Sequence, residues 1–263
     1  MRELRTCPAT GVTVLLNDAW PDRAREPAAV PASCWACGAP GPVIANHGGL
    51  VVVPHPVPAL GIEGDVRTRV APQGVRRDAV GAHELIFGDH AEAAPGLLLL
   101  AAQRVADLRR DRRFRGFHCF RLHAPAWHPV WQLLALPVDV APSHPAPWRD
   151  AERDAGVRVV AEVAGAIAIA AWAPRVPFET WVIPAHGEAE FPEGFEAVAA
   201  LAEWVLGRMG EVLGGPEIAI TVEEGTPWRL VLRPNVSVAL PTLAVGLPGH
   251  GVFPERAAAE LRE

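Results

Sequence analysis

The sequence predicts an α+β protein built from antiparallel sheets with a few helices. Short β-rich runs bounded by Gly or Pro recur along the chain, and only two long segments carry apolar residues at helical spacing. The order of strands and helix in the first half returns in the second, which indicates a duplicated β-β-α-β-β-like unit. With 263 residues, 50% of them hydrophobic, the chain can form one large domain or two small ones.

The first half opens with an arm rich in Pro and Ala, which leads into the strands. Strands are expected where β-branched residues are flanked by Gly or Pro, at residues 11–16, 42–46, 49–53 and 83–87. The segment 61–77 reads as a loop. A helix is expected at residues 96–109, where a run of arginines ends the apolar pattern and suits the helix dipole. Strands at residues 116–122 and 128–136 complete this half.

A Pro-rich segment at residues 137–148 reads as a linker, and it predicts two domains, residues 1–143 and 144–263. After it, strands are expected at residues 157–162, 166–172, 180–183, 218–223 and 228–233. A helix is expected at residues 194–213, stopped by Gly214-Gly215. Arg229 and Arg233 then point to one side of their strand, as an anion site or as a surface stripe.

Composition excludes several function classes. The net charge is −6 with acids and bases interleaved, so we expect no nucleic-acid partner. The apolar runs are too short to span a bilayer and the N-terminus has no signal core, so we expect no membrane partner and a cytoplasmic protein. All 24 residues counted as Lys plus Arg are Arg, which excludes Schiff-base and phosphate-loop lysine chemistry.

Four residues offer the ligands of a zinc site. Cys34-Trp-Ala-Cys37 supplies two thiolates and His90 and His128 supply two imidazoles, a set that suits a closed tetrahedral site. Because four protein ligands leave no open position, the zinc is predicted to be structural. For the cysteine pair the alternative is a redox dithiol, which is disfavoured because the motif runs into Gly38-Ala-Pro-Gly-Pro42 and not into a helix. For His128 the alternative is an ordinary histidine within a strand.

These motifs resemble, in order and nearly end to end, the galactose-1-phosphate uridylyltransferase family of the histidine-triad superfamily. The matching segments are Pro8-Ala-Thr-Gly11, Pro21-Asp-Arg-Ala-Arg-Glu-Pro27, Cys34-x-x-Cys37, Val53-Pro-His-Pro-Val-Pro-Ala-Leu60, Gly81-Ala-His-Glu-Leu-Ile86, His128-Pro-Val-Trp-Gln132, Pro177-Phe-Glu179 and Pro254-Glu-Arg-Ala-Ala-Ala-Glu-Leu-Arg262. The resemblance implies a duplicated histidine-triad fold, a homodimer, and zinc ligands at Cys34, Cys37, His90 and His128. His83 is the substitute for His90.

The chain departs from the family at the reacting centre. The nucleophilic histidine that forms the uridylyl-histidine intermediate is matched by Val130, which has no lone pair to attack phosphorus. The phosphate-binding glutamine is kept as Gln132, and Arg23 matches one of two early arginines. An asparagine that contacts the nucleotide is matched by His55, and the strand that carries a second metal in some members has lost its histidines.

Two classes of function follow from the resemblance. The first is a diverged zinc-braced transferase, serving specialised metabolism, that acts on a nucleotide, sugar phosphate or related small molecule without the covalent step. In it Gln132, Arg23 and His55 bind substrate, and Gln132 with His118 or His123 carries the chemistry. The second is a non-catalytic pseudoenzyme that binds or scaffolds. The two histidines can equally be ordinary residues of a half-exposed strand, and the tryptophans can be core or can line a cleft.

Overall fold

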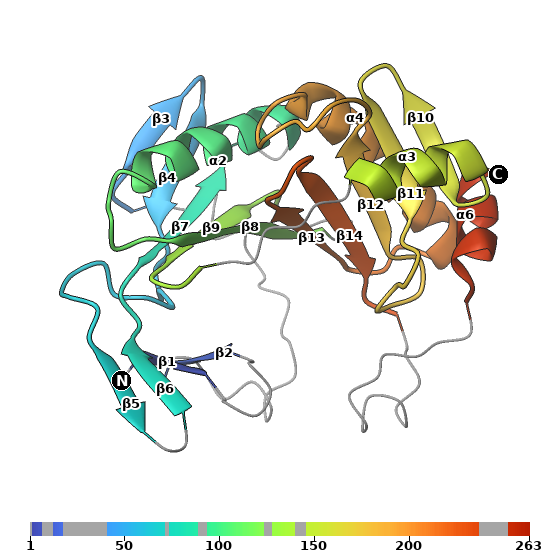
Figure 1. Ribbon diagram of the computed structural model, residues 1–263. Helices are drawn as coiled ribbons and strands as arrows, with labels where there is room; N and C mark the ends of the chain where they lie inside the picture. Colours follow the sequence, from blue (N-terminus) through green and yellow to red (C-terminus); the bar gives the residue numbers. More distant parts are fainter. Residues whose placement is uncertain are drawn as a thin grey trace. The chain divides into compact units, whose positions relative to one another are not determined.

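The α+β architecture is confirmed by the computed structural model, which describes residues 2–6, 13–17, 41–71, 74–88, 94–123, 128–139, 146–236 and 252–263. Two sheets are formed, one with the strand order β2-β1-β6-β5 and one with the order β10-β11-β12-β14-β13-β8-β9-β7-β4-β3 (Figure 1). Every strand pairing with a defined register is antiparallel.

The strands are β1 (Arg2–Thr6), β2 (Thr13–Asn17), β3 (Ala45–His47), β4 (Leu50–Pro54), β5 (Thr68–Ala71), β6 (Gly74–Asp78), β7 (Ala82–Phe87), β8 (Gly116–His123), β9 (Trp131–Leu136), β10 (Val159–Val163), β11 (Ala166–Ala170), β12 (Thr180–Pro184), β13 (Ile218–Glu223) and β14 (Arg229–Pro234). Within the described ranges the helices are α2 (Ala94–Leu108), α3 (Ala146–Ala155), α4 (Phe195–Leu213) and α6 (Pro254–Arg262). None of these helices is both long and apolar enough to cross a membrane.

The chain divides into two compact units whose segments alternate along the sequence. The first consists of Met1–Asp89, Gln103–His118 and Gln132–Val140, and the second of His90–Ala102, Cys119–Trp131 and Ala141–Glu263. Helix α2 and strands β8 and β9 therefore contribute residues to both units. The boundary between residues 143 and 144 stays a prediction.

In the first unit, the backbone of Gly81, the residue before β7, lies against Ala135 of β9. A Cβ atom added to this glycine would lie 2.1 Å from the carbonyl oxygen of Ala135 and 2.7 Å from a methyl carbon of Leu60. Only a residue without a side chain fits there. The glycine therefore allows the start of β7, which carries His83, to lie directly against β9, which carries Gln132.

The expected loop at residues 61–77 is wrong for two stretches, because β5 and β6 form a hairpin there. The N-terminal arm likewise contains a strand, β1, between β2 and β6. Strands β5 and β6 were missed because Arg69 and the adjacent pair Arg76-Arg77 interrupt the apolar period on which strand prediction depends. In addition, β1 pairs with a strand some 70 residues away, which no local pattern reveals.

In the second unit, α4 agrees with the helix expected at residues 194–213. Gly194 and Gly214 flank it with φ of 71° and 75°, left-handed values that glycine adopts without strain. Its buried face packs on β11 and β12, and α6 packs on α4, β10 and β11. The terminal helix α6 coincides with the matching segment at residues 254–262, for which no helix was predicted.

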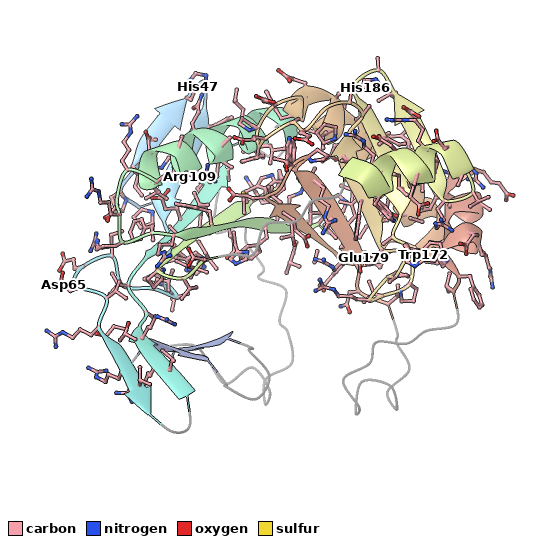
Figure 2. All side chains as sticks on the ribbon, viewed as in Figure 1. His47, Asp65, Arg109, Trp172, Glu179 and His186 are labelled. Carbon is pink, nitrogen blue, oxygen red and sulfur yellow. The ribbon has the colours of Figure 1, made fainter. Side chains whose placement is uncertain are left out.

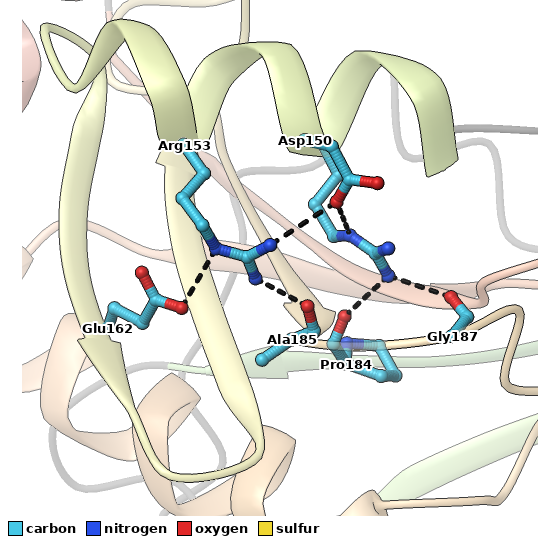
Figure 3. A network of polar contacts seen from close by, with 7 residues as sticks. Asp150, Arg153, Glu162, Pro184, Ala185 and Gly187 are labelled. Atoms are coloured by element: carbon cyan, nitrogen blue, oxygen red, sulfur yellow. Dashed lines mark hydrogen bonds and ion pairs between the residues drawn. The ribbon is translucent and has the colours of Figure 1, made fainter.

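The linker expected at residues 137–148 is wrong at its end, because α3 begins at Ala146. Trp148 packs on a core of Ile167, Ile169 and Ile183. Proline is tolerated in a first helical turn, so the prolines of this segment misled the prediction. Arg149 donates to the carbonyls of Pro184 at 3.0 Å and Gly187 at 2.9 Å, and Arg153 binds Ala185 and Glu162, as Figure 3 shows.

The remaining elements agree with expectation within a few residues. The helix expected at residues 96–109 is α2, and β13 has the predicted bounds. The strand expected at residues 128–136 begins only at Trp131. His128 and Val130 therefore precede β9, in backbone that is neither helix nor strand.

Candidate functional site

His83 is the centre of a polar cluster in the first unit. Its imidazole lies on β7 and is 8% exposed. Nδ1 accepts a hydrogen bond from the backbone N–H of Ala59 at 3.0 Å, and Nε2 lies 3.1 Å from Oε1 of Gln132. Because Nδ1 accepts, the proton of the neutral ring is assigned to Nε2, which donates to Gln132.

His55 stacks on His83. The two ring centroids are 4.0 Å apart with an interplanar angle of 15°, and the backbone N–H of His55 donates to the carbonyl of His83 at 2.8 Å. Nδ1 of His55 accepts from the N–H of Val57 at 3.0 Å. The neutral ring therefore carries its proton on Nε2, as His83 does.

Both imidazoles are held in the neutral form. Burial, together with repulsion by His55, lowers the pKa of His83 to about 4, although the hydrogen bond to Gln132 opposes the shift. Burial also lowers the pKa of His55, against the hydrogen bond from Val57. At neutral pH the cluster is therefore a set of uncharged donors.

The two faces of the sheet have different roles in this unit. Glu84, the neighbour of His83 on β7, is 4% exposed and binds Arg104 of α2 through two hydrogen bonds of 2.8 and 2.9 Å. Because neighbouring strand residues point to opposite faces, His83 and Gln132 lie on the face away from α2. Phe117 contacts Arg109 just beyond α2, at 5.3 Å, so His118 shares the face of Gln132.

His123 lies on the other face. It is five residues from His118, and in a strand an odd separation reverses the side. Arg121, on the same face as His123, lines a small cavity beneath α4 and donates to Glu203 at 2.7 Å. Burial and Arg121 lower the pKa of His123. The structure therefore brings His55, Gln132 and His118 to one face and leaves His123 out.

Trp131 fills the α4 side of β9. Its ring is 2% exposed and lines the same cavity as Arg121. It therefore does not cover the face that carries Gln132. Trp228 is also buried, whereas Trp172 is 62% exposed with Arg158 over its ring at 4.3 Å (Figure 2). The tryptophans in the second unit thus include both core and surface residues.

Most of the predicted zinc ligands lie outside the described residues: Cys34, Cys37 and His90, and with them the substrate-binding candidate Arg23. His128 is half-buried and precedes β9. The substitute ligand His83 uses both ring nitrogens in hydrogen bonds. A metal would have to displace one of them, which favours His90. The donor set suits zinc by its chemistry, and the site stays a prediction.

Arg229 and Arg233 do point to one side, but their charges are balanced. Arg229 donates twice to one carboxylate oxygen of Glu223, Arg233 donates to the other at 2.9 Å, and Arg229 also covers Trp181 at 3.7 Å. Arg233 lies 3.4 Å from the buried Glu179, which Figure 2 labels. Burial would raise the pKa of Glu223, but the two arginines outweigh it and lower it. This cluster is an internal ion-pair network.

Sequence reasoning missed the partners that orient these side chains. The pairing of Glu84 with Arg104, which shows the face on which His83 lies, was not predicted, and neither was the pairing of Glu223 with the two arginines. The sequence did carry one usable signal. His118 and His123 are five residues apart on one expected strand, and an odd spacing places their side chains on opposite faces of the sheet.

The fold is similar to that of solved structures of a uridylyltransferase and of an ADP-glucose phosphorylase, over 99–100% of this chain. No protein-family model matches the sequence, and no curated protein sequence matches it. A solved uridylyltransferase structure has a TM-score of 0.73 and 18% identity, covering 99% of this chain and 97% of that one.

Two plant structures are also similar. An ADP-glucose phosphorylase from Arabidopsis thaliana with bound ADP-glucose has a TM-score of 0.66 and 21% identity, covering 100% of this chain and 98% of that one. A GalT-like protein from the same plant has a TM-score of 0.66 and 20% identity, covering 84% of this chain and 86% of that one. At such identities the comparison establishes the fold.

Proposed function

We propose that this chain is a diverged transferase of the uridylyltransferase-like fold that binds a nucleotide or sugar phosphate at the His55, His83 and Gln132 cluster and works without a covalent histidyl intermediate. The fold supports nucleotidyltransferase or phosphorylase-type chemistry, because structures with both names share it. The observation that carries the proposal is the orientation of the Gln132 amide.

The amide of Gln132 is oriented to donate hydrogen bonds to a phosphate group. Its Oε1 accepts from His83, so its NH₂ group keeps two donors for a ligand. Nε2–H of His55 is a further neutral donor, because Nδ1 is already engaged by Val57. Phosphate oxygens are the acceptors that such a set of donors suits. The tautomer gives His55 a binding role and not that of a base.

Val130 determines the reaction type that we propose. Without an imidazole there, transfer is a single displacement: the acceptor oxygen forms its bond to phosphorus as the bond to the leaving group breaks. The proton of the acceptor goes to His118, which shares the Gln132 face. Structural zinc at Cys34, Cys37, His90 and His128 would brace this half of the chain, and the active form is proposed to be a cytoplasmic homodimer.

Calorimetric titration with ADP-glucose, uridine diphosphate sugars and sugar phosphates tests binding, and phosphorus NMR tests turnover. Gln132→Glu removes the donor amide and adds a negative charge, so it should weaken phosphate binding by at least about 100-fold. Gln103→Glu, on the exposed side of α2, makes the same change elsewhere and should leave affinity unaltered. Equal affinities for the two variants, or no ligand in the panel, would overturn the proposal.

The second candidate is a pseudoenzyme that binds the same ligands without turnover. The substitution at Val130 favours it, because the position of the attacking group carries an aliphatic side chain. Binding that depends on Gln132, with an unchanged phosphorus spectrum across the panel, would select this alternative.

A further inference from the structure

Two buried N–H groups of the second unit have no hydrogen-bond acceptor among the residues that the structure describes. They are Nε–H of Arg121 on β8 and Nε1–H of Trp131 on β9. Arg121 is only 4% exposed and Trp131 2%. A buried donor without an acceptor carries its full desolvation cost, so a pair of them in one place calls for an explanation.

Both donors belong to residues that line one cavity. Arg121 and Trp131 enclose it together with Glu203 of α4, and its volume is about 10 Å³. The guanidinium carbon of Arg121 lies 5.6 Å from the centroid of the Trp131 ring. A space of this size holds about one atom as large as a water oxygen. A single acceptor atom in the cavity could therefore take hydrogen bonds from both residues.

Glu203 is the only lining residue whose side chain can accept a hydrogen bond. The remaining lining residues are apolar: Leu98, Ala199, Ala202, Leu206, Ile220 and Leu230. A water molecule would have only the Glu203 carboxylate for its own two hydrogens, and a buried polar hydrogen without a partner is costly. A halide ion accepts from every direction and donates nothing. The two donors and the apolar wall therefore suit a monatomic anion.

The charge of Arg121 also favours an anion. Its Nη2 donates to Oε1 of Glu203 at 2.7 Å, but the Glu203 side chain is 42% exposed whereas that of Arg121 is 5% exposed. Burial lowers the pKa of Arg121, and the attraction of Glu203 opposes the shift. Because Glu203 reaches solvent, its carboxylate can turn outward at little cost. An anion at Nε would then be the buried counter-charge of the guanidinium.

We propose that Arg121 and Trp131 bind one halide ion in the cavity beneath α4, and that Glu203 competes with this ion for Arg121. The volume of the cavity excludes phosphate, sulfate and carboxylate ligands, each of which has several heavy atoms. None of the residues of the proposed phosphate site lines the cavity, so the inference does not depend on the proposed function. Bromide is the probe, because its anomalous scattering distinguishes it from water.

Anomalous diffraction from crystals of the full chain in sodium bromide provides the first test. One peak is expected within hydrogen-bonding distance of both Nε of Arg121 and Nε1 of Trp131. Electron density at that position without an anomalous signal would identify a water molecule and overturn the proposal. Bromide peaks found only beside exposed arginines would mean an adventitious ion only, which would overturn it as well.

The affinity in solution follows from urea unfolding over a series of bromide concentrations, because an ion that binds only the folded state raises its stability. Sodium fluoride keeps the ionic strength constant, since its strongly hydrated anion does not enter an apolar cavity. Trp131→Phe removes one donor and should weaken bromide binding at least about fivefold. Trp172→Phe makes the same exchange at an exposed position and should change the affinity by less than about twofold.

A gain of affinity provides a further arm that does not risk unfolding. Glu203→Gln removes the competing negative charge from a half-exposed side chain and should tighten bromide binding about tenfold. Glu211→Gln removes the same charge from an exposed position later on α4 and should change the affinity by less than about twofold. Equal bromide dependence in either variant and its control, or no bromide dependence in the parent, would overturn the proposal.

Discussion

Acidification should destabilise this protein through His83 in particular. The pKa of the buried imidazole is lowered to about 4, whereas in the unfolded chain it is about 6.5. Between these values the unfolded state binds the proton and the folded state does not. The contribution of the neutral ring is therefore complete above pH 6.5 and is lost as pH falls toward 4.

The size of the effect follows from the two pKa values. Lowering the pH from 7 to 5 with a shift of this size removes at most about 2 kcal/mol of stability, and the full shift corresponds to about 3.4 kcal/mol. A loss of about 2 kcal/mol is a large part of the stability of an ordinary domain. The physical cause is that the protonated ring would turn an N–H toward the N–H of Ala59.

Urea unfolding at pH 7 and pH 5 measures the effect on the parent and on His83→Gln. Glutamine has no proton to gain, so the variant should lose less stability between the two pH values than the parent. His186→Gln, at an exposed position labelled in Figure 2, should behave like the parent. Acid would also release zinc from the predicted site, and that loss would be common to all three proteins. If the parent and His83→Gln lose the same stability, the assignment of a buried neutral ring is refuted.

Three further substitutions test the packing and the reacting centre. Gly81→Ala forces a Cβ against the carbonyl of Ala135 and should cost about 3 kcal/mol in urea unfolding, whereas Gly207→Ala, in the open interior of α4, should stabilise by up to about 1 kcal/mol. Glu84→Gln leaves Arg104 buried without its main counter-charge and should cost about 3 kcal/mol by the same assay; a neutral result would contradict the buried pair. Val130→His should produce a nucleotidylated protein, visible by mass spectrometry, if the remainder of the nucleotide site persists.

Local sequence patterns predicted the elements that have their own end signals or a regular apolar face. Helix α4 combines helical spacing with glycines at both ends, and β13 alternates buried and half-buried residues along its length. Strands β5 and β6 have arginines where apolar residues would be expected, so their pairing is visible only in the structure. Helix α3 was hidden by the prolines around its start.

Part of the candidate site could likewise be predicted from the sequence, and part could not. Gln132 and His55 could be proposed from aligned motifs, but the roles of their neighbours depend on contacts between distant residues. Nothing in the sequence says that His83 accepts from Ala59, 24 residues earlier, or that Glu223 binds both Arg229 and Arg233. Motifs identified candidate residues, and tertiary hydrogen bonds determined which nitrogen of each ring is a donor.

One chain of hydrogen bonds links the fold to the proposed chemistry. Because of it, acid should affect the stability of the folded state and the binding of a ligand differently. The N–H of Ala59 fixes the tautomer of His83, and that tautomer fixes which end of the Gln132 amide faces a ligand. Protonation of His83 keeps Nε2–H directed at Gln132 and disturbs only the contact with Ala59. Moderate acid should therefore weaken the folded state while the Gln132 amide still presents its NH₂ group. A site that depended on a charged histidine would show the opposite order, gaining affinity for phosphate as the ring took up its proton.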